Sequence, residues 1–223
     1  MEQRYMRSIP ALTEEEQQLL HRKKAAVIGC GGLGGYLIEY LARLGIGAVR
    51  AVDGDVFEPS NLNRQLLSDV TGIGKSKALA AQERVYSVNP DVTVEACPVF
   101  LTRENAAELI RDCDIVLDAL DNIPARKILA EACTGAEIPL VYGGISGWIA
   151  QAAVSLPGDT LIDRLYPEGT QIRDKSVLSF TPAMCAAMQT ALCVKLLTGR
   201  PVETGKLYYF DLLHQEFESI PMT

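Results

Sequence analysis

The stretch that most constrains the fold runs from residue 24 to residue 53 and reads KAAVIGCGGLGGYLIEYLARLGIGAVRAVD. A short apolar run at residues 25–28 predicts a buried parallel strand. A glycine-rich turn follows, and apolar residues then recur at helical spacing as far as Leu44. A second apolar run, residues 48–52, ends on Asp53. The order of strand, turn, helix and strand predicts a βαβ unit.

The glycines of the turn have the spacing G-x-G-x-x-G, formed by Gly29, Gly31 and Gly34, with Gly32 as an extra glycine. Glycine lets the backbone turn tightly and approach a phosphate, which then faces the free N–H groups at the start of the helix. Asp53 ends the second strand, where an acid can accept hydrogen bonds from ribose hydroxyls. The combination predicts a nucleotide-binding site.

The length and composition of the chain fit one α/β domain over residues 1–223, with 48% hydrophobic and 22% charged residues. The net charge of −7 and the lack of a basic block argue against nucleic-acid binding. No apolar run long enough to cross a membrane stands out, and the first ten residues, MEQRYMRSIP, have no apolar signal core. We therefore expect a cytoplasmic protein.

Six cysteines are scattered without any C-x-x-C pair, and the two histidines lie far apart. In a cytoplasmic protein this pattern predicts free and mostly buried thiols rather than disulfides or a metal site. The cysteines are Cys30, Cys97, Cys113, Cys133, Cys185 and Cys193.

Strands and helices alternate through the first 140 residues, which predicts a parallel sheet with right-handed crossovers. The C-terminal third favours antiparallel strands. The fold class is therefore α/β: a Rossmann-like, mostly parallel sheet flanked by helices, with antiparallel strands in the C-terminal third. Predicted helices cover residues 13–23 (with a Thr13–Glu16 capping box), 76–88, 102–111 (capped by Thr102), 124–136 and 182–197. Further predicted strands cover residues 92–96, 114–120, 140–142 and 147–156, and a turn at Gly143-Gly144 joins the last two. Residues 4–8 are expected to lie outside the core, and residues 157–179 are expected to form a loop.

The polar stretch after Asp53 is longer than the usual connection between a strand and a helix, and long loops in compact domains tend to be functional. Arg64 and Lys77 could neutralise phosphates, and Asp121 could hold Mg²⁺ on them. A nicotinamide enzyme needs only a pyrophosphate turn and a ribose acid, so these extra charges favour a triphosphate. Five polar residues fall beyond the carboxyl ends of predicted strands or in loops there, where open α/β sheets bind ligands: Asp53, Asn61, Arg64, Lys77 and Asp121.

Several motifs together resemble the ThiF/MoeB/HesA adenylyltransferases, the bacterial relatives of ubiquitin-activating enzymes. These are G-C-G-G-L-G-G, V-D-G-D-V-F-E-P-S-N-L-N-R-Q, G-I-G-K-S-K-A, V-N-P and D-I-V-L-D-A-L-D-N, followed by Arg126. The resemblance implies that ATP adenylates the C-terminal Gly-Gly carboxylate of a small ubiquitin-fold sulfur-carrier protein (ThiS- or MoaD-like), with release of pyrophosphate.

The resemblance also implies roles for single residues. The glycine loop around Gly32 would lie against the nucleotide, Asp53 would bind the ribose with Asp55 nearby, and Asn61 and Arg64 would hold phosphates. The family's phosphate-binding lysine matches Lys77 rather than Lys75, because Lys77 stands thirteen residues after Arg64 and thirteen before Pro90. Asp121 would ligate Mg²⁺ beside Asn122. Arg7 would reach ATP phosphates bound to the neighbouring subunit, which implies a homodimer.

The chain departs from the family pattern at its cysteines. Many members carry a zinc-binding C-x-x-C in the segment that matches Leu161–Pro167, which has no cysteine here, so no zinc is predicted. Residues 134–184, where thioester- or persulfide-forming members place a cysteine, contain none either. Cys185 and Cys193 fall within an apolar helix and favour a core role. These departures predict an enzyme that stops at the acyl-adenylate.

Several alternatives remain open at this point. The acceptor could be a peptide or a modified tRNA nucleoside instead of a carrier protein. The protein could be an NAD-dependent oxidoreductase, with Asp53 favouring NAD over its phosphorylated form. It could also be an ATP-binding sensor or scaffold without turnover. Neither the pathway (thiamine, molybdopterin or cysteine) nor the sulfur donor follows from the residues.

Overall fold

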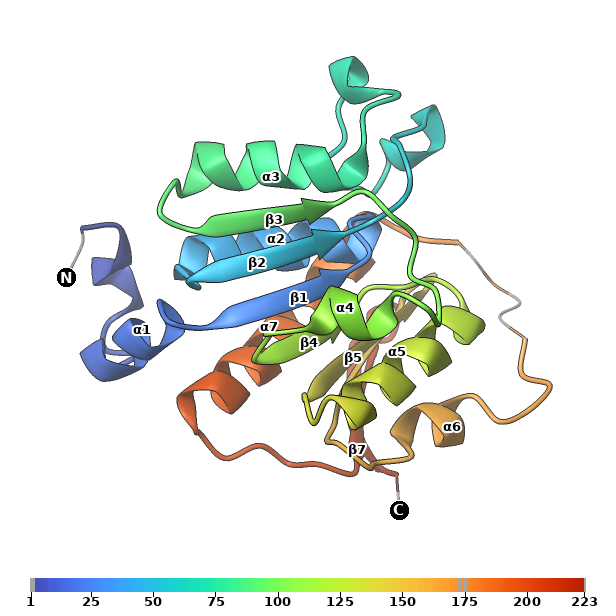
Figure 1. Ribbon diagram of the computed structural model, residues 1–223. Coiled ribbons are helices and arrows are strands. Elements are labelled where there is room, and N and C mark those ends of the chain that lie inside the picture. The colour runs from blue at the N-terminus through green and yellow to red at the C-terminus, as the bar shows by residue number, and fades with distance from the viewer. Residues whose placement is uncertain (1–2, 172–173, 175, 223) are drawn as a thin grey trace.

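The computed structural model describes residues 3–171, 174 and 176–222, and it contains one eight-stranded sheet (Figure 1). The strand order is β3-β2-β1-β4-β5-β6-β7-β8. The pairs from β3 to β5 are parallel and those from β5 to β8 are antiparallel, as expected for the fold class. The strands are β1 (Lys24–Ile28), β2 (Ala48–Val52), β3 (Thr93–Cys97), β4 (Ile115–Asp118), β5 (Leu140–Ser146), β6 (Ile149–Ser155), β7 (Lys206–Asp211) and β8 (Glu216–Pro221).

Helices cover both faces of the sheet. Apolar side chains of α2, α3 and α7 join one core cluster, and those of α4, α5 and α6 join another. The order β1–β2–β3 runs outward in one direction and β4–β5 in the other, so the sheet is doubly wound around the β1–β4 boundary. The helices are η1 (Gln3–Ser8), α1 (Glu14–Leu20), α2 (Gly32–Leu44), η2 (Pro59–Asn61), η3 (Val70–Gly72), α3 (Lys77–Val88), α4 (Ala106–Ile110), α5 (Ile123–Gly135), α6 (Leu161–Leu165) and α7 (Phe180–Thr198).

Helix α2 packs unusually close to the end of β1 because the contact is made of glycines. A Cβ atom on Gly34 would lie 1.8 Å from the carbonyl oxygen of Gly29. Gly29 itself has φ +100°, a conformation that favours glycine. The predicted glycine turn therefore forms, and it fixes the start of α2 directly beyond the carboxyl end of β1.

Helix α7 is buried against the sheet, as its apolar sequence predicts. It packs on α2, β4, β5 and β6, and its buried residues include Cys185 and Cys193. By length and composition alone α7 is apolar enough to cross a membrane, contrary to the expectation that no such run stands out. Half of this apolar stretch of α7 is buried inside the protein, however, as in the core helix of a globular protein.

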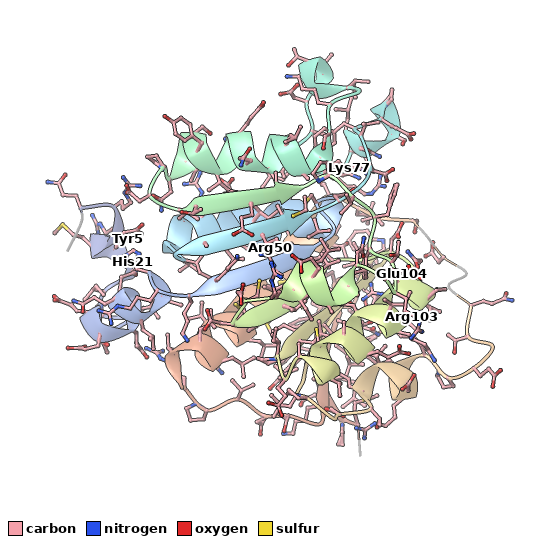
Figure 2. All side chains as sticks on the ribbon, viewed as in Figure 1. Tyr5, His21, Arg50, Lys77, Arg103 and Glu104 are labelled. Carbon is pink, nitrogen blue, oxygen red and sulfur yellow. The ribbon has the colours of Figure 1, made fainter. Side chains whose placement is uncertain are left out.

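The N-terminal segment differs from the sequence prediction, which placed residues 4–8 outside the core. Tyr5 in η1 is only 1% exposed, and its hydroxyl accepts a 2.8 Å hydrogen bond from Asn89 Nδ2. Its ring packs edge-on against His21, 4.9 Å away between centroids (Figure 2). The space for the ring exists because Gly45 has no Cβ, which would lie 2.4 Å from the tyrosine oxygen.

Local polar contacts explain why one predicted helix is shorter. The helix expected over residues 102–111 is α4, which begins only at Ala106. Asn105 accepts a hydrogen bond from the Thr102 N–H (2.7 Å) and donates one to the Phe100 carbonyl (2.9 Å), which holds these residues in a turn. Thr102 is therefore not the N-cap.

The glycine pair at residues 143–144 does not form the predicted turn. It lies inside β5 and pairs with β6, opposite Gln151 and Ala152. The strands reverse instead between Ser146 and Ile149, where Gly147 has φ +53°. The predicted loop over residues 157–179 also contains α6, whose Leu161 and Ile162 are buried in the core.

We expect Gly34→Ala to destabilise the protein, because the added methyl group meets a backbone carbonyl that cannot move without shifting β1. The free energy of unfolding should fall by about 1–3 kcal/mol, measured by urea denaturation. Gly135→Ala is the matched control: it lies in α5 with no atom within 4 Å of the new Cβ, so its stability should stay equal or rise slightly. Equal effects of the two substitutions would contradict the close-packing explanation.

Candidate active site

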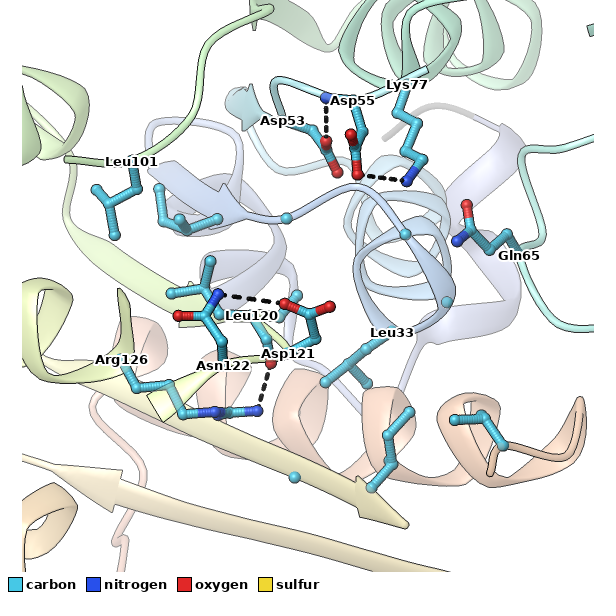
Figure 3. A pocket seen from close by; sticks show the side chains of 18 of the residues that line it. Leu33, Asp53, Asp55, Gln65, Lys77, Leu101, Leu120, Asp121, Asn122 and Arg126 are labelled. Atoms are coloured by element: carbon cyan, nitrogen blue, oxygen red, sulfur yellow. Dashed lines mark hydrogen bonds and ion pairs between the residues drawn. The ribbon is translucent and has the colours of Figure 1, made fainter. Parts of the chain in front are cut away.

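A cleft of about 470 Å³ opens at the carboxyl ends of β1, β2 and β4 (Figure 3). Its position at the boundary between the two halves of the doubly wound sheet is where such folds bind ligands. The cleft brings together most of the residues expected to bind nucleotide: Gly29, Gly31, Gly32, Asp53, Asp55, Arg64, Lys77, Asp121 and Asn122.

Asp53 holds the glycine loop in place. One carboxylate oxygen accepts a 2.7 Å hydrogen bond from the Cys30 N–H, and the other accepts a 2.8 Å bond from the Asp55 N–H. Burial raises the pKa of Asp53, while these two backbone donors and the nearby Lys77 oppose that rise. Each carboxylate oxygen has more than one acceptor position, so Asp53 can still accept bonds from a ligand.

Lys77 presents its ammonium group at the cleft from the first residue of α3. Its side chain is 8% exposed, and Nζ lies 3.2 Å from the carboxylate of Asp55, whose own side chain is 59% exposed. A backbone bond from Lys77 N–H to the Asp55 carbonyl (3.0 Å) ties the two residues together. Lys77 lines the cleft and Lys75 does not.

Arg64 covers the glycine loop. A Cβ on Gly32 would lie 3.6 Å from Arg64 Cγ, which places the arginine stem directly over this part of the loop. Its Nη1 donates 2.8 Å hydrogen bonds to the Ser60 carbonyl and to Asn63 Oδ1. Both acceptors are neutral, so neither bond offsets the positive charge of the guanidinium group.

Asp121 and Asn122 form the turn that leads from β4 into α5. Asn122 is the N-cap: its Oδ1 accepts a 3.0 Å bond from the Ala125 N–H, and its Nδ2 donates to Asp121 Oδ1 at 3.3 Å. Both residues are exposed to solvent in the cleft. Within the described part of the chain, no group of three or more His, Cys, Asp or Glu side chains is arranged to hold a metal ion. A magnesium ion at Asp121 would therefore need ligands from a bound phosphate and water, which is how Mg²⁺ usually binds in nucleotide sites.

Three expected site residues lie elsewhere. Gly34 makes the packing contact with β1 and does not line the cleft. Asn61 is buried, and its Oδ1 accepts a 3.1 Å bond from the Glu58 N–H within η2. Arg7 belongs to η1, which lies at the end of the sheet where the parallel strands begin, far from Lys77 (Figures 1 and 2). Within one subunit Arg7 therefore cannot reach the cleft.

Sequence reasoning missed the apolar and aromatic lining of the cleft. Phe100 packs over Gly54, where a Cβ would lie 2.6 Å from the ring. Arg126, noted only as part of a motif, lies in the floor of the cleft (Figure 3). Neither residue belongs to a periodic pattern that would have given it a role. The other unpredicted lining residues include Leu33, Gln65, Leu101, Leu120, Tyr142, Gln151 and Tyr166.

The cysteines are placed as core residues. Cys30, Cys185 and Cys193 are completely buried. Burial raises the pKa of Cys185 and of Cys193 to about 12 and that of Cys30 well above its usual value, so these thiols stay protonated at neutral pH. The expected core role of Cys185 and Cys193 agrees with this environment.

The fold is a doubly wound α/β domain, and its cleft gathers a glycine-rich turn, Asp53, Arg64 and Lys77. The chain belongs to the ThiF family, which it matches over residues 3–223. A sulfur carrier protein adenylyltransferase from Thermus thermophilus is 36% identical, with 95% of this chain and 83% of the relative covered. The SAMP-activating enzyme E1 of Haloferax volcanii is 34% identical, covering 93% and 79%. The structure of Escherichia coli MccB with ATP has the same fold, with a TM-score of 0.84 at 21% identity, covering 100% of this chain and 72% of that one.

We expect one thiol, Cys97, to react with a thiol reagent in the native protein at about pH 8, because it alone of the six cysteines is partly exposed. All six should react after denaturation. Labelling followed by peptide mass spectrometry measures this directly. Rapid labelling of Cys185 in the native protein would contradict its assignment to the core.

Proposed function

We propose that this protein adenylates the C-terminal Gly-Gly carboxylate of a small ubiquitin-fold sulfur-carrier protein with ATP and releases pyrophosphate. The observation that carries the proposal is the convergence of the glycine loop, Asp53, Arg64, Lys77 and Asp121 in one cleft. The named relatives, an adenylyltransferase and an activating enzyme, support the same reaction class.

Each residue has a physical role in the proposed reaction. The N–H groups at the start of α2 face the phosphates, and Asp53 accepts hydrogen bonds from the ribose. An oxygen of the carrier carboxylate forms a bond to the α-phosphorus, and the bond from that phosphorus to the pyrophosphate oxygen breaks. Arg64 and Lys77 stabilise the negative charge that builds on the departing pyrophosphate. Catalysis therefore rests on positioning and electrostatics, without a covalent intermediate on the protein.

Magnesium fits this site through Asp121, whose carboxylate faces the cleft with only Asn122 bonded to it among the described residues. When bound, Mg²⁺ would offset phosphate charge. No zinc site is proposed, because Leu161–Pro167 carries no cysteine. The buried thiols also support an enzyme that ends at the acyl-adenylate.

The wider assembly is proposed as a homodimer in which Arg7 of one subunit completes the site of the other. The position of η1 away from its own cleft supports an action in trans. We also propose that the chain works as one domain in the cytoplasm, where its six free thiols would remain reduced. The oxidoreductase alternative loses support, because the family shown by the comparisons is ThiF.

The decisive experiment is ATP–pyrophosphate exchange with Mg²⁺ against a panel of Gly-Gly-ended carrier proteins. Exchange that depends on one carrier would establish the reaction and name the pathway. Measurable ATP binding without exchange would favour the sensor alternative, or a peptide or tRNA acceptor tested next in the same assay. Tight NAD binding without ATP binding would overturn the proposal.

We expect Arg64→Ala and Lys77→Ala each to lower the rate of carrier-dependent exchange by about 10²–10³, as removal of one preorganised charge-stabilising group does elsewhere. Lys75→Ala is the matched control, because this lysine lies two residues away and outside the cleft. Its rate should stay close to that of the wild type. A loss below tenfold for both Arg64→Ala and Lys77→Ala would contradict the phosphate assignment.

The proposed dimer predicts complementation between two inactive variants. Arg7→Ala and Arg64→Ala should each be nearly inactive alone. When they are mixed and allowed to exchange subunits, half of the dimers are mixed, and one site in each mixed dimer has both arginines, so roughly a quarter of wild-type activity should return. No recovery despite subunit exchange, followed by native mass spectrometry, would rule out Arg7 acting in trans.

A further inference from the structure

The floor of the cleft is a fork between β4 and β5. These strands pair only at Val116 with Leu140 and at Leu117 with Val141. Beyond that point β4 ends at Asp118, while β5 continues to Ser146 in an antiparallel pair with β6. Carbonyl groups on both sides of the fork therefore need partners other than each other.

Two long side chains fill the fork from opposite faces of the sheet. Gln189 of α7 donates 2.9 Å hydrogen bonds to the carbonyls of Asp118 and Val141. It fits because Gly143 has no side chain: a Cβ there would lie 2.2 Å from Gln189 Oε1. From the α5 face, Arg126 donates a 2.8 Å bond to the Gly143 carbonyl. The two side chains join β4 to β5 where the ladder has stopped.

Arg126 makes further contacts that end beside the proposed metal residue. Its Nη1 donates to Asp118 Oδ2 at 2.6 Å, and its Nη2 donates to the carbonyl of Leu120 (Figure 3). Asp118 is fully buried, and its other carboxylate oxygen accepts a 2.9 Å bond from the Leu120 N–H. Both backbone polar groups of Leu120 are thus fixed by the Arg126–Asp118 pair. Asp121 is the next residue.

Aromatic rings close the other side of the guanidinium group. Its carbon lies 5.1 Å from the ring centre of Tyr142 and 5.8 Å from that of Tyr166. The two tyrosine hydroxyls are 2.7 Å apart, and Tyr142 donates to Gln151 at 3.2 Å. Arg126 is 4% exposed, so its rotamer is set by these neighbours rather than by solvent.

We propose that Arg126 is a positioning residue: through Leu120 and Asp118 it sets the position of the Asp121 carboxylate in the cleft. The inference rests on the proposed function, since it assigns Arg126 to the metal and phosphate end of that reaction. Lysine cannot replace it, because one ammonium group lacks the planar set of donors that here reaches Asp118, Gly143 and Leu120 at once.

The test compares Arg126→Lys with Arg50→Lys. Arg50 is a matched control: it is also buried, donates to three backbone carbonyls near the end of α4, and pairs with Glu95, but it lies outside the cleft. Arg126→Lys should lower kcat by about tenfold or more and raise the Mg²⁺ concentration for half-maximal exchange several-fold. The KM for ATP should stay within about twofold, because the glycine loop and Asp53 are untouched. Arg50→Lys should change only the thermal midpoint.

A double-mutant cycle with Asp121→Asn tests the route of the effect. If Arg126 acts through Asp121, adding Arg126→Lys to Asp121→Asn should cause little further change in the Mg²⁺ dependence. The proposal would be overturned if the double variant raised the Mg²⁺ requirement by the product of the two single-variant effects. So would an unchanged Mg²⁺ requirement in Arg126→Lys.

Two additions keep the test decisive. If Arg126→Lys folds poorly, the double variant Asp118→Asn/Arg126→Gln replaces it, because this variant leaves no unpaired buried charge. Glutamine is too short to reproduce the three contacts of Arg126, so the double variant should also need more Mg²⁺ than the wild type. Recovery to the wild-type requirement would contradict a positioning role. Calorimetric binding of α,β-methylene ATP with and without Mg²⁺ needs no carrier. It therefore tests Arg126 even if exchange fails in the wild type, and that failure would count against the proposed function alone.

Discussion

The contact between Gly34 and Gly29 is the constraint on which the site depends. Only the absence of a side chain at Gly34 lets α2 begin directly over the end of β1. This places the free N–H groups of the helix start at the mouth of the cleft, in the arrangement that binds anions in other proteins. Asp53 then locks the loop from the next strand by accepting bonds from Cys30 and Asp55. The proposed nucleotide site thus rests on backbone packing before any cation is considered.

The parts of this site that were predictable depend on local signals. The first βαβ unit and its acid follow from periodicity and from glycine chemistry. The preference for Lys77 over Lys75 comes instead from the motif of the family that the sequence resembles. The sequence places Tyr5 outside the core, because nothing in its neighbours along the chain reveals the space beside Gly45, 40 residues away. Gly143 and Gly144 predict a turn from sequence, although in the structure they make room for the Gln189 and Tyr142 side chains against a strand. Long-range packing of this kind leaves no periodic trace in sequence.

The fork between β4 and β5 makes the floor of the cleft. The β4–β5 ladder stops at Leu117 and Val141, whereas β5 continues to Ser146 with its other edge paired to β6 along its whole length. The buried carbonyls there would each cost about 1–3 kcal/mol if left without partners. Gln189 and Arg126 satisfy them from opposite faces. The same side chains that complete the sheet therefore also shape the site.

The buried cations of the cleft divide into one that can change partners and one that cannot. Lys77 is paired with Asp55, whose side chain is 59% exposed, so water can solvate this carboxylate when the lysine bonds to another group. A bound phosphate can therefore take over the lysine at little cost. Arg126 is paired with Asp118, which is fully buried, and breaking a buried pair costs about 3–5 kcal/mol. Both cations are buried, so the difference lies in their carboxylate partners. Lys77 can bond to a ligand because Asp55 is exposed, whereas Arg126 must stay in place because Asp118 is buried.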